Sequence, residues 1–350
     1  MPVTVVVGGQ FGGEGKGKVA HFLAKEMGAK VAVRVGGTNS GHTVIDPFGN
    51  ALILRQLPTP AILPNVTCVL GAGSYIDVGI LHDEIKRTGL SLDRLFIHPN
   101  AVIITENDVS SENKGSLRNS IGSTLSGTGA AVLSRISRDG SAKLAKYDDR
   151  LKPFIRPVMP VMRDVLSDGG RIIIEGTQGF GLSVLHTPYY PYATSRDTSA
   201  AAFVSEAGLS PMDVDDIVLV IRAFPIRVAG NSGNLPNEID WEIITTESNN
   251  PGEIIEYTSV TKTIRRVARF DPEIVNAAIM TNQPTRIVLN HLDYIDAKCA
   301  ALNRLTDRTV QFVEKIESLI KHKVDYLGFG PSCIEKSNIQ LFSIEAAYGR

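Results

Sequence analysis

Residues 3–18 of the chain read VTVVVGGQFGGEGKGK. The β-branched run at 3–7 predicts a buried strand, and the glycines and lysines after it are typical of a turn that leads into a helix. Glycines let backbone N–H groups approach an oxyanion, a helix N-terminus adds its positive dipole, and lysines neutralise the remaining charge. We therefore expect residues 8–18 to form a phosphate-binding loop that follows the first strand of an α/β fold.

This phosphate-binding loop departs from the standard P-loop pattern in two ways. Five residues instead of four separate Gly9 from Gly15, and Lys16 is followed by Gly17, where Ser or Thr would ligate magnesium. A generic ATPase is therefore not indicated.

Charge and composition restrict the possible partners and location. The 350 residues carry a formal net charge of −1, so no overall basic field indicates nucleic acid. The apolar stretches are too short to span a membrane, and residues 8–10 interrupt the first one, where a signal peptide would continue. The cysteines at 68, 299 and 333 lack metal-ligand spacing. We expect a cytoplasmic protein with free thiols.

Short β-branched runs alternate with helical patterns along the chain. Strands are expected at 3–7, 31–35, 66–70, 101–104, 171–175, 217–222 and 286–289. Helices are expected at 18–27, 78–88, 153–167, 199–207 and 306–322. This alternation is typical of helices that flank a largely parallel central sheet. We therefore expect an α/β fold in a single domain, residues 1–350, with large loop insertions.

Polar, glycine-rich segments mark the candidate site, since ligands in open α/β sheets bind on loops beyond the carboxyl ends of strands. In the segment 36–43, His42 could donate to a phosphoryl oxygen or stabilise a developing oxyanion. A lone histidine in such a turn is more often simply exposed, but the phosphate-binding loop nearby in sequence favours the functional interpretation.

Three further segments have open alternatives. Residues 121–129 are either a second anion-binding loop or a flexible linker, and Gln178 suits either a ligand or a helix cap. The segment 260–266 concentrates three positive charges, which could bind a dicarboxylate or a nucleotide, or could form a solvated basic face.

Together these segments resemble the adenylosuccinate synthetase family over nearly the whole chain, from Gly8 to Pro331. The markers occur in family order: GGQ at 8–10, GEGKGK at 13–18, NSGHT at 39–43, IGST at 121–124, EGTQG at 175–179, YPY at 190–192, RR at 265–266, LD at 292–293 and GP at 330–331. The length is similar to that of the short archaeal-type members.

One departure from the family pattern carries most information. Relatives have an aspartate where this chain has Gly13; that aspartate takes the N1 proton of inosine monophosphate and ligates magnesium. The phage branch of the family, which makes the diaminopurine nucleotide of modified genomes, resembles this chain in having Gly or Ser there, and its substrate is dGMP. Because the 2-amino group of dGMP lies beside N1, we expect Gly13 to leave room for it.

Two more departures concern the aspartate-binding region. The family's Thr-Gly-Arg is Thr261-Lys262-Thr263 here, so Thr263 replaces an arginine that serves the ribose and aspartate region in relatives, and Lys262 could supply the charge. Ser126 stands where many bacterial members have an aspartate-binding arginine.

The resemblance implies a ligase that joins L-aspartate to C6 of dGMP and forms 2-amino-2′-deoxy-N6-succinyladenylate, a precursor of diaminopurine DNA. A nucleoside triphosphate first phosphorylates O6, and the aspartate amine then displaces phosphate. Asp293 suits guanine and argues for GTP, whereas the phage branch is associated with ATP or dATP; we favour ATP. The alternatives are ordinary adenylosuccinate synthesis from inosine monophosphate and GTP, and a catalytically silent nucleotide-binding protein.

The resemblance also implies roles for individual residues. Catalysis is assigned to Gly13, Lys16 and His42. Triphosphate binding is assigned to Gly12, Gly13, Glu14, Gly15, Lys16, Gly17, Lys18, Gly41, His42, Thr43, Asp293, Gly328 and Gly330. Binding of dGMP is assigned to Asn39, Ser123, Thr124, Arg138, Gln178 and Thr194, with Arg138 reaching the neighbouring subunit of a homodimer. Aspartate binding is assigned to Thr258, Ser259, Val260, Thr261, Lys262, Thr263 and Arg265. Mg²⁺ is assigned to the carbonyls of Gly13 and Gly41.

Overall fold

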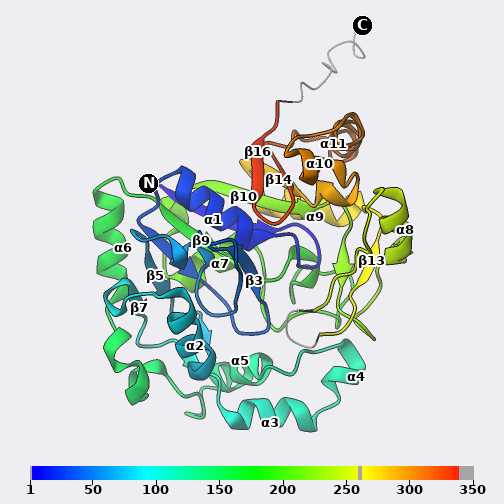
Figure 1. Ribbon diagram of the computed structural model, residues 1–350. Helices are drawn as coiled ribbons and strands as arrows, with labels where there is room; N and C mark the ends of the chain where they lie inside the picture. Colours follow the sequence, from blue (N-terminus) through cyan, green and yellow to red (C-terminus); the bar gives the residue numbers. More distant parts are fainter. Residues whose placement is uncertain (1, 259–261, 339–350) are drawn as a thin grey trace, which may run out of the picture.

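The computed structural model describes residues 2–258 and 262–338, and a nine-stranded sheet forms its centre (Figure 1). Neighbouring strands are parallel except β15 and β16. In spatial order the strands are β16 (Cys333–Lys336), β15 (Tyr326–Phe329), β14 (Arg286–Asn290), β10 (Val214–Arg222), β1 (Val3–Gly8), β9 (Ile172–Glu175), β2 (Val31–Arg34), β5 (Thr67–Leu70) and β7 (Leu95–Ile97).

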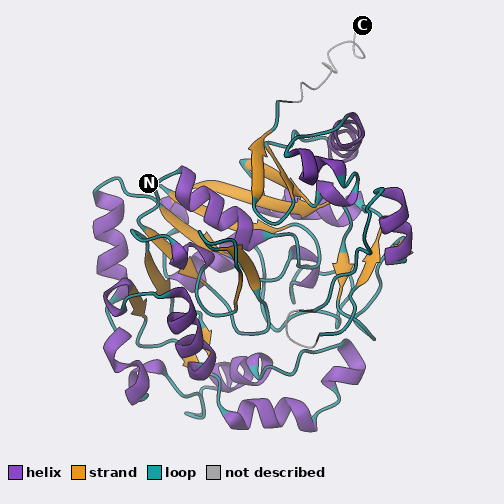
Figure 2. Ribbon diagram, viewed as in Figure 1, coloured by secondary structure: helices purple, strands orange, loops and turns teal. Residues whose placement is uncertain are grey.

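Helices surround this sheet (Figure 2). They are α1 (Lys16–Glu26), α2 (Val78–Thr88), α3 (Glu106–Lys114), α4 (Leu117–Ile121), α5 (Thr128–Ser137), α6 (Val158–Ser167), α7 (Ala200–Ala207), α8 (Trp241–Glu247), α9 (Pro272–Asn282), α10 (Lys298–Leu302) and α11 (Asp307–Ile320). Within the described residues, no helix combines the length and apolar character that crossing a membrane requires.

The alternation of side chains along β1 divides the core into two layers. Val6 points to one face, where it packs with Val19 and Leu23 of α1. Val5 points to the other face, into the cluster that α6, α7, α9 and α11 complete. Burial on both faces explains why the strand reads as a continuous apolar run, and the α/β fold with a mostly parallel central sheet is confirmed.

Short strands lie outside the main sheet. They are β3 (His42–Ile45) with β4 (Ala51–Leu54), β6 (Tyr75–Ile76) with β8 (Val102–Ile103), and β11 (Ile226–Arg227) and β12 (Glu238–Ile239) on either side of β13 (Arg266–Ala268). The strand expected at 101–104 is thus β8, which pairs with β6 and not with the main sheet.

The expected helix 153–167 begins only at Val158, which corrects the prediction. Pro153 lies in a 3₁₀ segment, Asp149–Phe154, and Pro157 is the N-cap residue of α6. A proline lacks the N–H that a continuous α-helix needs, so the two segments stay separate. The helix expected at 18–27 starts earlier, at Lys16, because Gly15 takes a left-handed conformation (φ 90°) that ends the phosphate-binding loop.

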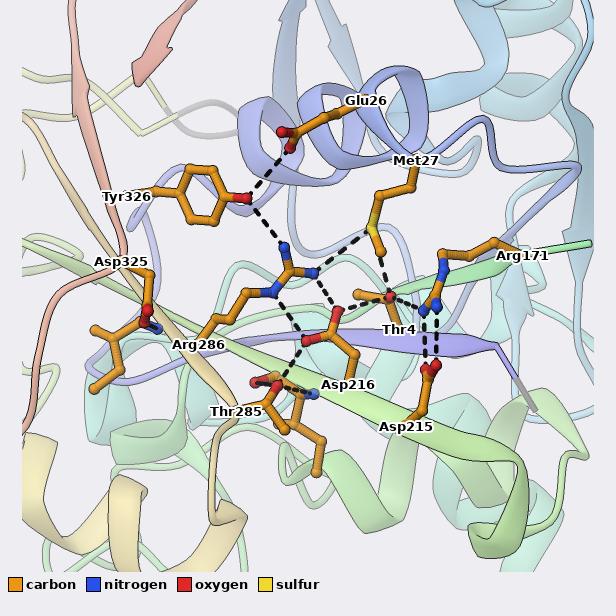
Figure 3. A network of polar contacts seen from close by, with 12 residues as sticks. Thr4, Glu26, Met27, Arg171, Asp215, Asp216, Thr285, Arg286, Asp325 and Tyr326 are labelled. Carbon is orange, nitrogen blue, oxygen red and sulfur yellow. Dashed lines mark hydrogen bonds and ion pairs between the residues drawn. The ribbon is translucent and has the colours of Figure 1, made fainter. Parts of the chain in front are cut away.

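A polar network ties three strands together at the end of the sheet opposite their carboxyl ends (Figure 3). The carboxylate of Asp216 on β10 accepts hydrogen bonds from Thr4 of β1 at 2.8 Å and from Thr285 at 2.6 Å. It also pairs with the guanidinium of Arg286, the first residue of β14. Burial opposes ionisation of this carboxyl, but the hydrogen bonds from Arg286 and Thr285 outweigh that effect and lower the pKa of Asp216.

We expect Asp216→Asn to lower the free energy of unfolding by about 1–3 kcal/mol at pH 7, because it leaves Arg286 without its counterion. The pKa of Asp216 is depressed in the folded state, so the difference from the wild type should vanish only as the pH falls below the ordinary aspartate range. Urea denaturation checks both statements. An unchanged stability at pH 7 would contradict the importance of this ion pair.

Candidate active site

A cavity of about 320 Å³ lies at the carboxyl ends of the central strands. Its lining comes from the phosphate-binding loop, the segment 39–43, the strand β11 and the loops that follow β9 and β14. The structure brings fifteen of the predicted residues together here: Gly12, Gly13, Gly15, Lys16, Gly17, Lys18, Asn39, Gly41, His42, Thr43, Thr124, Gln178, Thr258, Arg265 and Gly330. The size suits a small-molecule site.

Glu14 holds the phosphate-binding loop in shape. Its fully buried carboxylate accepts hydrogen bonds from the backbone N–H groups of Gly12 (2.8 Å) and Gln10 (3.2 Å). The second oxygen of the same carboxylate lies 2.7 Å from Nζ of Lys16. Glu14 is therefore turned into the loop and acts as its internal counterion, whereas Lys16 and the loop glycines line the cavity.

His42 belongs to a buried cluster of charged side chains behind the cavity. Its Nδ1 lies 2.6 Å from Oε1 of Glu175, at the end of β9, and 2.5 Å from Nη1 of Arg34, at the end of β2. The same carboxylate oxygen lies 2.5 Å from Arg34 Nη1. Burial and the adjacent Arg34 guanidinium lower the pKa of His42 to about 3, so the free imidazole is neutral at pH 7.

A second charged group surrounds Gly13. Arg222, at the end of β10, donates from Nη1 to the Gly13 carbonyl at 2.8 Å and pairs with Glu256. Arg265 completes the group, with Nε 3.9 Å from Glu256. Although burial opposes ionisation, the nearby Arg222 lowers the pKa of Glu256 to about 2. This carboxylate therefore stays ionised and is a poor proton acceptor at neutral pH.

These contacts correct the expectation that the Gly13 carbonyl binds Mg²⁺. A guanidinium already donates to this oxygen, and its charge would repel a divalent cation. In the described parts of the chain, no group of three His, Cys, Asp or Glu side chains is arranged to hold a metal. The assignment of Mg²⁺ to the Gly41 carbonyl stays a prediction: Gly41 is in the cavity lining, and the other ligands would come from phosphate oxygens and water.

The expected open space beside Gly13 is also corrected. A Cβ at this position would lie 2.5 Å from Cδ1 of Ile226, 3.0 Å from Nη1 of Arg265 and 3.1 Å from Nη1 of Arg222. The ends of three side chains therefore occupy the side of Gly13 on which relatives carry a side chain, and these ends would have to shift to admit one. The φ of +71° also favours glycine at this position.

Several predicted residues lie outside the cavity lining. Ser123 and Thr263 line an adjoining groove that shares Thr124 with the cavity. Arg138 is exposed at the end of α5, and Lys262 is exposed with a left-handed φ of 54°. Three other predicted residues are also outside the lining. The hydroxyl of Thr194 lies 3.5 Å from Nδ2 of Asn39. Asp293 follows β14, and Gly328 is buried in β15. Ser259, Val260 and Thr261 lie outside the described residues.

Sequence reasoning identified Arg265 but missed three other arginines at or beside the site, Arg34, Arg222 and Arg227. Arg227 of β11 lines the cavity, with its guanidinium 4.6 Å from the ring centroid of Phe11 and 5.6 Å from that of Tyr189. Burial, followed by the charge of Arg266, lowers the pKa of Arg227 to about 10, so it remains a cation. Two other buried arginines, Arg34 and Arg222, occupy the last positions of their strands. The sequence signal that could have identified them is a positively charged residue at the end of an apolar strand.

Comparisons with known proteins identify the family of this chain. The family model for adenylosuccinate synthetase matches residues 5–143 and 141–299. Adenylosuccinate synthetase from Methanococcus aeolicus is 35% identical over 348 residues, which cover 97% of this chain and 100% of that protein. The chain therefore belongs to the adenylosuccinate synthetase family, whose members are ligases that form a C–N bond in purine nucleotide synthesis.

Two solved structures are similar to this fold. Succinoaminodeoxyadenylate synthetase (PurZ) from cyanophage S-2L, bound to dGMP and to dATP as an energy donor, has a TM-score of 0.81 and 30% identity, covering 96% of this chain and 95% of that one. The fully ligated adenylosuccinate synthetase from Plasmodium falciparum has a TM-score of 0.84 at 20% identity, covering 97% and 100%. The second similarity concerns the fold alone.

Proposed function

We propose that this ligase joins L-aspartate to dGMP, with ATP or dATP as the energy source, and forms 2-amino-2′-deoxy-N6-succinyladenylate. The observation that carries the proposal is Gly13, where the aspartate of ordinary adenylosuccinate synthetases is absent. The resemblance to the cyanophage enzyme, whose structure holds dGMP and dATP, supports the same substrate.

The charged groups around Gly13 support a different environment for the N1 and C2 side of the purine. The cavity-lining carboxylate near Gly13 is Glu256, which is paired with Arg222 and keeps a low pKa. Within the described part of this region, no free carboxylate takes over the place of the missing aspartate. We infer that the purine meets backbone at this edge, whose carbonyl oxygens can accept from a 2-amino group, an arrangement that differs from an aspartate directed at N1.

The remaining machinery suits phosphoryl transfer to O6 followed by attack of the aspartate amine. The loop N–H groups and Lys16 would hold and neutralise the transferring phosphoryl group, with His42 beside it. Mg²⁺, when bound through the Gly41 carbonyl and phosphate oxygens, would neutralise further charge. Arg265 and Thr258 would hold aspartate, and Arg138 would reach the dGMP phosphate of a neighbouring subunit in a homodimer. Because Lys16, His42 and Gln178 line one cavity, a catalytically silent protein is disfavoured.

Ordinary adenylosuccinate synthesis from inosine monophosphate and GTP is the second candidate, because the similar archaeal proteins bear that name. A phosphate-release assay with aspartate separates the two. We expect kcat/KM with dGMP to exceed that with inosine monophosphate by about tenfold or more, since a site that pairs with a substrate's amino group discriminates against the analogue that lacks it. ATP, dATP and GTP are compared in the same assay.

The product must also be identified, because phosphate release alone could come from triphosphate hydrolysis. Omission of aspartate is the matched control, and mass spectrometry of the nucleotide shows whether succinate was added to the guanine ring. Turnover of inosine monophosphate equal to or faster than that of dGMP would end the proposal.

A further inference from the structure

Glu175 lies behind His42 and outside the cavity lining, and no role in the reaction has been assigned to it above. Its side chain is fully buried, and each of its oxygens has partners from different elements. Oε1 meets Nδ1 of His42 at 2.6 Å and Nη1 of Arg34 at 2.5 Å. Oε2 accepts hydrogen bonds from the backbone N–H (2.8 Å) and the hydroxyl (2.7 Å) of Thr59.

We propose that Glu175 is a positioning residue, whose carboxylate fixes one tautomer and one orientation of the His42 ring. A ring held at Nδ1 by Glu175 would turn its second nitrogen, Nε2, towards the cavity, whose lining includes His42. Because a carboxylate behind an imidazole sets which ring nitrogen carries the proton, the ring is oriented before any substrate enters.

The tautomer follows from the charges that meet at Nδ1. Arg34 also approaches Nδ1, at 2.5 Å, and could donate to it if the nitrogen were unprotonated. That arrangement would place a nitrogen lone pair 2.6 Å from the Glu175 oxygen, which is ionised because Arg34 and His42 outweigh the effect of burial and lower its pKa. A protonated Nδ1 removes this repulsion and lets both His42 and Arg34 donate to Glu175, provided that the Arg34 Nη1 hydrogens are directed at the carboxylate and not at Nδ1.

Glu175 also connects the His42 ring with the phosphate-binding loop. The Thr59 hydroxyl that contacts Glu175 lies 2.8 Å from the Gly17 carbonyl in the first turn of α1. If Glu175 served only to pair with Arg34 between β2 and β9, its contact with Thr59 would not be needed. Because a hydroxyl carries a single proton, Thr59 shares it between these two oxygens and so links the carboxylate behind the ring to the first turn of α1.

The variant Glu175→Gln tests the proposal, which depends on His42 acting in the proposed reaction. We expect kcat to fall by about 10- to 100-fold, as found for residues that orient a functional histidine, with the KM values little changed. In a His42→Ala background the same substitution should cause no further loss of kcat, because its effect passes through the ring. Asp216→Asn is the matched control: it removes another carboxylate partner of an arginine, at the opposite end of the sheet, and should leave kcat unchanged.

A direct reading of the tautomer keeps the proposal testable if Glu175→Gln fails to fold. Long-range ¹H–¹⁵N NMR of histidine-labelled wild type at pH 7 should show His42 protonated at Nδ1, and Thr59→Val should retain that signature. A His42 protonated at Nε2, an unchanged kcat in folded Glu175→Gln, or a full further loss in the His42→Ala background would each overturn it. The kcat assays use whichever purine nucleotide the wild type converts faster. A preference for inosine monophosphate would therefore refute the proposed function but would leave the test of Glu175 intact.

Discussion

Substitution of Lys16 by alanine should abolish nearly all activity, with kcat lower by about 10³-fold or more. Lys16, the first residue of α1, is one of two lysines of the phosphate-binding loop that line the cavity. In phosphoryl transfer, a single positioned cation at the transferring group contributes a factor of this order. Phosphate release under saturating substrates measures the loss, and a variant that keeps a tenth of the wild-type rate would contradict this role.

The same substitution should also destabilise the fold, for a separate reason that a second variant exposes. Removal of Lys16 leaves the buried Glu14 carboxylate without its partner at 2.7 Å, which costs about 3–5 kcal/mol. Glu14→Gln combined with Lys16→Ala removes both charges, and the amide oxygen can still accept from the Gly12 N–H. The double variant should therefore regain much of the stability and none of the activity. This result would show that the loss of activity does not arise from the loss of stability.

The phosphate-binding loop could be predicted from the sequence because all its determinants are local. A β-branched run, glycines that tolerate positive φ, and lysines at the start of a helix lie within sixteen residues. Gln10 shows where local information ends. It counts in the sequence only as a family marker, whereas in the structure its side-chain amide donates to the backbone carbonyl of Arg222 (3.2 Å) and accepts from its N–H (2.9 Å). The partners are 212 positions apart, so no local pattern could show the pair.

The missed elements have a similar explanation. Helix α9 buries residues on more than one side, among them Ile274, Val275 and Ala278, and so lacks the single apolar stripe that marks an exposed helix. Strand β15 is four residues long and contains Gly328, a residue that weakens a strand pattern. Both elements owe their structure to the sheet and helices they pack against, and their own residues gave only a weak signal.

The arginines Arg34 and Arg222 could not be assigned from the sequence for a different reason. Each ends an apolar strand, and each is buried only because a carboxylate from a distant segment, Glu175 or Glu256, meets it at the carboxyl edge of the sheet. The sequence shows the cation but not its partner. Such ion pairs determine which carbonyl oxygens and how much space are available near Gly13, and this is why the two expectations about Gly13 needed correction.

Restoring the family's aspartate by Gly13→Asp should lower kcat/KM for dGMP by about tenfold or more. A Cβ at this position meets Ile226 at 2.5 Å, and the added carboxylate would lie among the guanidiniums of Arg222 and Arg265. It would compete with Glu256 for both cations and draw Arg222 away from the Gly13 carbonyl. The positive φ adds strain, although aspartate tolerates that conformation better than most residues. Phosphate release with dGMP and with inosine monophosphate measures the effect.

Gly13→Ala distinguishes crowding from charge, because it adds the Cβ and the strain at φ +71° without a carboxylate. If crowding by Ile226 dominates, alanine should reduce dGMP turnover as much as aspartate does, and adding Ile226→Ala should restore part of it in both variants. If charge dominates, alanine should be milder, and Ile226→Ala should not rescue Gly13→Asp. We expect the second outcome, since the Ile226 contact involves one terminal methyl group, whereas the new carboxylate would disturb two ion pairs. An increase in dGMP turnover with Gly13→Asp would refute the link between this glycine and the diaminopurine reaction.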